Sequence, residues 1–228
     1  MMLLWLPFLA GLLPLVAMLG AFWLGVAYEV LPSCIPFVDG CVSISATGRK
    51  PPGSFLFRAT MLPESALLAA VWYFTALWLR SLHAGVRRSS ILIILLSGVL
   101  GAVALAVYVT FLGSKEPIYE FMRRSGIYFA FLGQWLAQLF TVIALLRICR
   151  DRNEIRLKPF ARTMLGICIA VLALGIVNLI LKSVLDDPDA AENRIEWTAA
   201  LLMQFYFFVL FVAWRRTGFR ASVTTGVD

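Results

Sequence analysis

The sequence predicts an all-α membrane protein, a bundle of six transmembrane helices with both termini in the cytoplasm. Three observations support this prediction: an apolar composition, six runs without charge, and an uneven distribution of Lys and Arg between the loops. Of the 228 residues, 61% are hydrophobic and 14% are charged, whereas a soluble domain has about 25% charged residues. The composition therefore favours a polytopic membrane protein over a soluble domain.

The six charge-free runs define the expected helices, because a spanning helix needs roughly 17 to 25 apolar residues. Five runs reach or nearly reach that length, and the segment "SFLFRATML" can extend the second. The first run lacks a basic start and is longer than the apolar core of a signal peptide, so we expect a span there. We expect one transmembrane domain over residues 1–217 and a polar cytoplasmic tail over 218–228. The runs are 3–28, 65–79, 89–112, 125–146, 163–181 and 197–214.

The basic residues set the expected orientation. The loops after the second and fourth spans and the C-terminal segment carry 12 of the 20 Lys and Arg residues. Short loops rich in Lys and Arg stay in the cytoplasm, so both termini should lie inside, in a plasma or inner membrane. The long polar segment 29–54 should then face outward, as should the shorter loops at about 113–124 and 183–196. The dispersed positive charge gives no support for nucleic-acid binding.

Several kinds of site are excluded by residue types alone. The chain has 1 His and 4 Cys, which cannot build the usual His-rich zinc site. His83 lies at the cytoplasmic end of the second span, and Ser43 and Ser45 lie across a bilayer of about 30 Å. A Ser-His-Asp triad needs hydrogen-bond contact and cannot form between them. We therefore expect no metal, no cofactor and no assigned catalytic residue.

The outer segment and the start of the second span hold the main candidate residues. Cys34 and Cys41 face an oxidising space if the orientation is right, and they are candidates for a disulfide. If the second helix begins near Ser54, Arg58 and Glu64 lie in its outer third and can share one polar site. If it begins at Pro63 instead, Glu64 lies in the first turn and Arg58 is only a headgroup anchor.

Four amide side chains interrupt the later spans. They indicate either hydrogen bonds between helices or a polar cavity, and hydrogen bonds within a helix bundle are the commoner use. Small residues four apart in "SGVLGAVALA" of the third span predict close helix packing, inside the bundle or in a dimer. The sequence leaves a homo-oligomer or a partner membrane protein open. The amides are Gln134, Gln138, Asn178 and Gln204.

The segment "PFVDGCVSISATGRKPPGSFLFR" resembles the first-loop signature of the Frag/DRAM/Sfk family. That family includes the damage-regulated autophagy modulator and the lipid-remodelling factor for GPI-anchored proteins. The resemblance implies a six-span, lipid-handling or lipid-sensing protein without a settled catalytic centre. It marks Ser43, Ser45 and Arg58. Glu64 stands where some relatives carry a histidine further along the helix, which weakens any transfer of remodelling chemistry. The matching elements are Pro36, Phe37, Ser43, Ile44, Ser45, Gly48, Pro51 or Pro52, Phe57 and Arg58.

These observations together favour a protein that binds, organises or helps remodel a membrane lipid at the outer leaflet. Arg58 is expected to hold a headgroup phosphate, since a guanidinium matches that geometry. Ser43, Ser45 and Asp39 are expected to hold sugar or glycerol hydroxyls, with the loop as a polar lid over the site. One rival is a lipid-modifying enzyme with Asp39 or Glu64 as acid or base. A transporter or channel has less support, because no internal repeat is visible.

Overall fold

The computed structural model describes residues 2–152 and 154–220. Six long helices and four short ones make up this part of the chain, with no strand among the described residues. The six long helices are long and apolar enough to cross a membrane, as the sequence predicts. In chain order the elements are η1 (Met2–Trp5), α1 (Leu6–Ala27), α2 (Pro36–Asp39), α3 (Ile44–Thr47), α4 (Gly53–Leu82), α5 (Arg88–Phe111), α6 (Pro117–Asp151), η2 (Ile155–Leu157), α7 (Lys158–Val184) and α8 (Asp189–Arg216).

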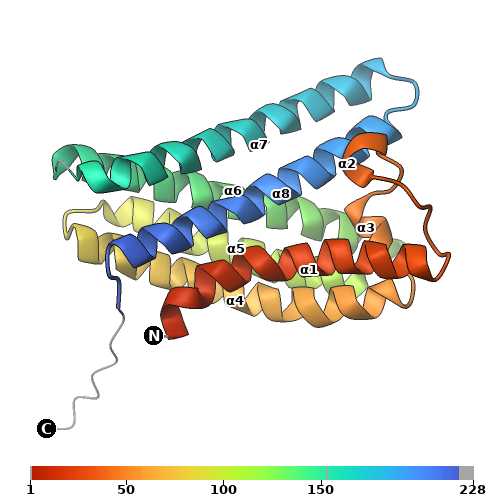
Figure 1. The fold of residues 1–228 in the computed structure, drawn as a ribbon, viewed down its shortest axis with the longest axis horizontal. Helices are drawn as coiled ribbons and strands as arrows, with labels where there is room; N and C mark the ends of the chain where they lie inside the picture. The colour runs from red at the N-terminus through yellow and green to blue at the C-terminus, as the bar shows by residue number, and fades with distance from the viewer. Residues whose placement is uncertain (1, 153, 221–228) are drawn as a thin grey trace, which may run out of the picture.

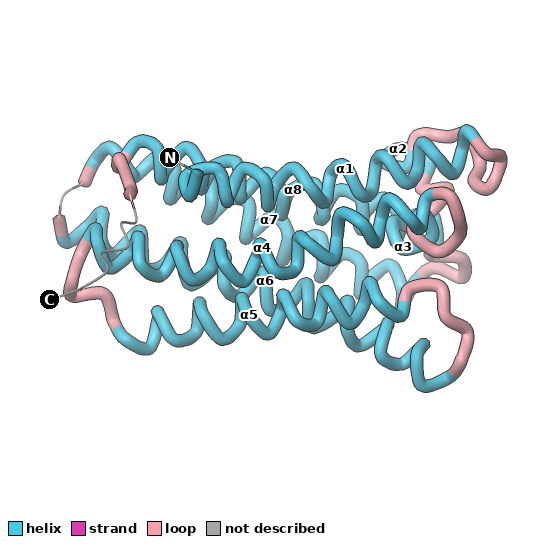
Figure 2. Tube along the Cα trace, turned by 90° about the horizontal axis from the view of Figure 1, so that it is seen from below, coloured by secondary structure: helices cyan, strands magenta, loops and turns pink. Residues whose placement is uncertain are grey.

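The long helices form a closed bundle in which each packs against the next, in the order α1, α4, α5, α6, α7, α8 and back to α1. Their axes run roughly along one direction, and the loops gather at the two ends (Figures 1 and 2). We call the end that carries α2 and α3 the loop end. The opposite end, where α1 begins and α8 finishes, is the tail end (Figure 1).

Two of the three expected outer loops are much shorter than the sequence indicates. α6 begins at Pro117 and α8 begins at Asp189, so the loops expected at about 113–124 and 183–196 are largely helical. Charge-free runs mark where a helix is apolar, whereas the helix itself continues past that point. In α6 the extra turns are supported by an ion pair between Arg124 and Glu120 at 2.6 Å, a spacing that stabilises a helix.

α5 and α6 approach each other closely through glycines. A side chain at Gly101 would meet Gln134 of α6 at 2.9 Å, and one at Gly133 would meet the Ser97 carbonyl of α5 at 2.6 Å. A side chain at Gly98 would overlap Trp72 of α4. The stripe of small residues in the third span therefore packs inside the bundle, where only glycine allows this contact.

We expect the transmembrane domain to end at residue 217, and the last long helix, α8, ends at Arg216. Of the tail expected over 218–228, residues 221–228 lie outside the described residues. Phe219 falls within the expected tail. It is 9% exposed and packs on Trp214, with ring centroids 5.1 Å apart.

Candidate functional site

The segment between α1 and α4 folds into a compact roof over the loop end, made of α2, α3 and the turns around them. Ser43 caps α3, since its hydroxyl accepts a hydrogen bond from the Ala46 amide at 3.2 Å. The hydroxyls of Ser43 and Ser45 lie 3.1 Å apart, and Arg49 donates to the Ser45 hydroxyl at 3.0 Å. Both signature serines thus make hydrogen bonds within the roof.

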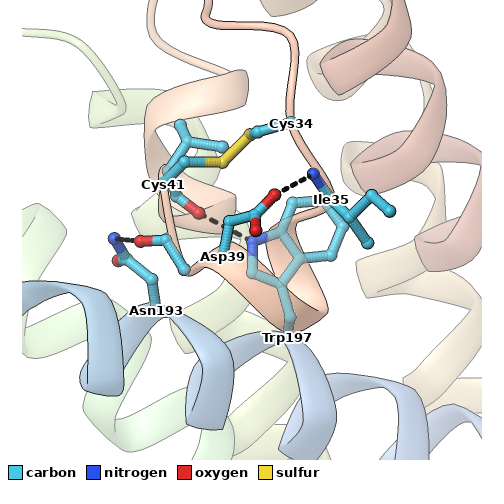
Figure 3. The surroundings of a disulfide bond; sticks show 8 residues. Cys34, Ile35, Asp39, Cys41, Asn193 and Trp197 are labelled. Carbon is cyan, nitrogen blue, oxygen red and sulfur yellow. Dashed lines mark hydrogen bonds between the residues drawn. A yellow bond between two sulfur atoms is a disulfide. The ribbon is translucent and has the colours of Figure 1, made fainter.

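A hydrogen bond attaches the roof to the start of α8, as Figure 3 shows. A disulfide joins Cys34 and Cys41, whose α carbons are 6.7 Å apart. Asp39 accepts a hydrogen bond from the Ile35 amide at 2.7 Å. From α8, Asn193 donates to the Gly40 carbonyl at 2.8 Å. These bonds fix the position of α2 relative to α8.

A tryptophan buried beneath the roof also attaches the roof to α8. Trp197 of α8 is fully buried and donates from its indole to the Val42 carbonyl at 2.8 Å (Figure 3). Phe37 packs against the same indole, with ring centroids 5.3 Å apart. Gly40 adopts a φ of 65°, and a side chain there would overlap the Ala190 carbonyl. Only glycine suits that position, because the conformation is strained for other residues and the approach is too close.

The C-terminal part of the roof rests on α4 and α5. A side chain at Gly48 would meet Leu112 at 2.7 Å and Phe57 at 2.8 Å. Arg58 is half-buried and donates to the Leu112 carbonyl at the end of α5. α4 begins at Gly53, so Arg58 and Glu64 both lie within a continuous helix, as expected if the second helix begins near Ser54.

A cavity lies inside the bundle beneath this roof, with space of about 90 Å³ for the centres of water molecules. A single water needs roughly 10 to 15 Å³ on this measure, so the cavity can hold several waters or part of a larger molecule. Its wall is mostly apolar, with polar groups from four helices. The polar lining residues are Glu64, Tyr108, Gln134, Glu196 and Gln204, and the apolar ones include Met18, Ile44, Phe57, Met61, Leu105, Phe131, Met203 and Phe207.

Glu64 is the most unusual group in this wall. Glu64 is 0% exposed, and neither of its carboxyl oxygens has a hydrogen-bond partner among the described residues. Arg58 does not line the cavity and forms no ion pair with Glu64. The structure therefore does not bring Arg58 and Glu64 together. Burying a polar group without a partner is costly, so the Glu64 carboxyl is available to a ligand that enters the cavity.

Glu196 is a second carboxyl in the same cavity, and sequence reasoning did not select it. It was assigned to the expected third outer loop, whereas it lies in the second turn of α8. Its carboxyl group lies beside the backbone amides of Ile44 and Ser45 at the start of α3. A signal for it was present: Glu196, Ala200 and Gln204 are four residues apart and share one helix face.

Two of the four intramembrane amides hold helices together. Gln134 accepts from the Trp72 indole of α4 at 2.6 Å and donates to the Gly98 carbonyl of α5 at 3.0 Å. Gln138 donates to the Met203 carbonyl of α8 at 3.3 Å. The expected helix-to-helix bonds thus exist, and Gln134 also faces the cavity.

The other two amides differ in their surroundings. Gln204 lines the cavity from α8. Asn178 lies on α7, which contributes no residue to this wall, and its side-chain oxygen has no partner among the described residues. The structure therefore does not gather the four amides into one site.

The fold and this roofed cavity define the chain as a multi-pass integral membrane protein. Residues 2–216 match the family described as the Frag1/DRAM/Sfk1/Cwh43P N-terminal domain, and the chain belongs to that family. No match to the chain is found among curated proteins or among solved structures.

Proposed function

We propose that the protein binds a membrane lipid in the cavity beneath the roof, at the outer leaflet of a plasma or inner membrane. The observation that carries this proposal is the unpartnered Glu64 carboxyl in a mostly apolar wall. An apolar wall suits an acyl chain, and a few placed polar groups are what fix the orientation of a bound molecule.

The depth of Glu64 indicates which part of a lipid it would contact. α4 has 30 residues, which is about 45 Å at 1.5 Å per residue. The hydrocarbon core is about 30 Å thick, so an equal overhang leaves about 7 Å of helix beyond each face. Glu64 lies 11 residues after Gly53, about 16 Å along the axis. That depth is about 9 Å inside the hydrocarbon face, below both the phosphate and the glycerol backbone, so Glu64 would contact a polar group, such as a hydroxyl, on a part of the lipid that enters the core.

The remaining residues expected to bind lipid have a different role in this proposal. Ser43, Ser45 and Asp39 already make hydrogen bonds inside the roof, and Arg58 holds the end of α5. We assign them the positioning of the roof over the cavity. Arg58 also retains a buried Nε without a partner among the described residues.

The test measures lipid bound to the purified full chain. The protein is extracted in mild detergent, and the retained lipid is identified and counted by mass spectrometry. Glu64→Gln keeps the shape of the side chain but changes its charge and hydrogen bonding, and it should lower retention of one lipid class severalfold. Glu116→Gln, an exposed change at the same end, is the matched control and should retain as much as the native chain.

A second variant tests the role of the cavity while leaving the Glu64 carboxyl unchanged. Ala200 lines the cavity and is 6% exposed, so Ala200→Leu should fill part of the space and also reduce retention. Equal lipid content in the native chain, Glu64→Gln and Ala200→Leu would show that the cavity is not the binding site.

The presence of two carboxyls in one cavity favours a second candidate function, a lipid-modifying enzyme. Glu64 and Glu196 lie in different surroundings, one without partners and one beside backbone amides. Two carboxyls in unlike surroundings are suited to separate acid and base roles. Incubation of the purified protein with extracted membrane lipids tests this candidate. Lipid that stays chemically unchanged over hours, while still being retained, would leave binding as the function.

A further inference from the structure

A second cavity lies at the tail end, between the α4–α5 turn and the last turns of α6. It has space of about 140 Å³ for the centres of water molecules. It is separate from the cavity beneath the roof, and no residue lines both. Its lining residues are His83, Gly85, Val86, Arg87, Ser90, Ala144, Arg147, Ile148, Arg150 and Asp151.

The charge of this wall is positive. Three guanidinium groups, from Arg87, Arg147 and Arg150, face one carboxylate, from Asp151. With His83 neutral the formal charge is +2. Arg150 is paired with Asp151 at 3.3 Å, whereas Arg87 and Arg147 form no ion pair with any described acidic residue. Two exposed guanidinium groups therefore remain available to an anion.

The N-terminus of α5 opens onto the same cavity. The helix begins at Arg88, and no side chain caps it. The first amides of a helix have no partner within the helix, and together with the helix dipole they favour an anion. Phosphate groups bind at helix starts for this reason.

A hydroxyl on a largely buried serine that opens to the cavity provides an independent sign of a ligand. Ser90, in the first turn of α5, is 5% exposed and lines the cavity. Its hydroxyl forms no hydrogen bond with another described residue. Its oxygen is not among the inaccessible side-chain atoms that lack a partner, so the hydroxyl is open to the cavity and can donate to a molecule held there.

His83 adds a further donor. Its Nδ1 accepts a hydrogen bond from the Arg152 Nε at 3.3 Å. A neutral imidazole carries one proton, and that proton is then on Nε2. His83 lines the cavity, so its contribution is a donor, which suits an anion and disfavours a cation.

We propose that this tail-end cavity binds a phosphate group, held by Arg87, Arg147, the Ser90 hydroxyl and the first amides of α5. The group can belong to the headgroup of an anionic lipid or to free phosphate. The site is at the end of the bundle where most Lys and Arg residues lie, the end predicted to be cytoplasmic. It does not depend on the lipid site beneath the roof.

The test uses the full chain in neutral detergent with two probes. In the first arm inorganic phosphate replaces chloride at constant ionic strength. In the second arm phosphatidic acid is added to phosphatidylcholine nanodiscs that hold the protein. Both arms measure saturable binding and the melting temperature. Loss of one charge-assisted hydrogen bond should weaken binding about tenfold, so Arg147→Gln and Ser90→Ala should each show that loss.

Arg156→Gln is the matched control, because Arg156 is exposed at the same end and does not line the cavity. It should bind both probes as the native chain does. Phosphate binding without lipid binding supports a free anion as the ligand, and lipid binding supports a headgroup. The absence of saturable binding in both arms would overturn the proposal. Equal losses of binding in Arg147→Gln and Arg156→Gln would also overturn the proposal, since that result indicates general charge attraction. Melting temperatures without ligand establish that each variant is folded.

Discussion

Replacing Glu64 with Leu should make the lipid-free protein more stable while weakening its binding of lipid. The carboxyl is fully buried and neither oxygen has a partner among the described residues. Leu is similar in size, and the surrounding wall is largely apolar. Mutational data put the cost of burying an uncompensated polar group at about 1 to 3 kcal/mol. The free energy of unfolding should therefore rise by about that amount.

The assay is unfolding by sodium dodecyl sulfate in mixed micelles, after exhaustive removal of bound lipid. Glu192→Leu is the matched control, because the Glu192 carboxylate is paired with Lys182 at 3.0 Å at a partly exposed position. Exposed ion pairs contribute about 0 to 1 kcal/mol, so the control should equal the native chain or be slightly less stable.

Adding lipid should make the native chain more stable than Glu64→Leu, the reverse of their order without lipid. A ligand present at 100 times its dissociation constant stabilises the state that binds it by about 2.7 kcal/mol. The native chain should gain that stabilisation, and Glu64→Leu should gain much less. A lipid-free Glu64→Leu protein that is less stable than the native chain by 1 kcal/mol or more would refute the reasoning. Glu64 would then be making a stabilising bond, and it would not be free for a ligand.

Three further predictions concern orientation and packing. Lys50→Cys and Arg156→Cys should react with an impermeant thiol reagent from opposite sides, and labelling of both from outside would contradict the predicted cytoplasmic location of the tail end. Gln134→Leu removes the partner of the Trp72 indole and should lower stability by about 1 kcal/mol, the usual worth of such a bond in a membrane, as measured by the same unfolding assay. Gly98→Leu should prevent folding, because its side chain would overlap Trp72; a folded, thermally stable variant in size-exclusion chromatography would count against the packing described.

The six spans could be predicted from sequence because hydrophobic length is a local property that a bilayer enforces. Helix ends could not, since the turns that leave the hydrocarbon carry charge and look like loop. Glu196 shows the consequence: it was counted with an acidic loop, and the structure places it in α8 against the cavity. Extending the helix of the last apolar run by one turn upstream would have placed Glu196 on the helix face of Gln204, eight residues later.

The contacts of side chains between helices could not be predicted from the sequence, for a different reason. Arg58 and Glu64 are close in sequence, but they extend in different directions from α4. Arg58 reaches the Leu112 carbonyl, and Glu64 faces the interior. Six residues on a straight helix do not share a face, so the surroundings of each side chain depended on where α5 and α8 pack. Similarly, the bonds from Asn193 and Trp197 to the roof join segments more than 150 residues apart.

The first-loop signature and the cavity have distinct roles in this fold. Ser43, Ser45 and Gly48 shape the roof or pack it on the bundle, Arg58 joins α4 to the end of α5, and Phe57 also contributes to the cavity wall. None of these residues supplies a polar group that faces the cavity interior. The polar interior groups here are two carboxyls, two amides and a tyrosine, without a histidine. It follows that the signature supports the shared architecture, while the chemistry of any bound lipid must be worked out from Glu64 and Glu196.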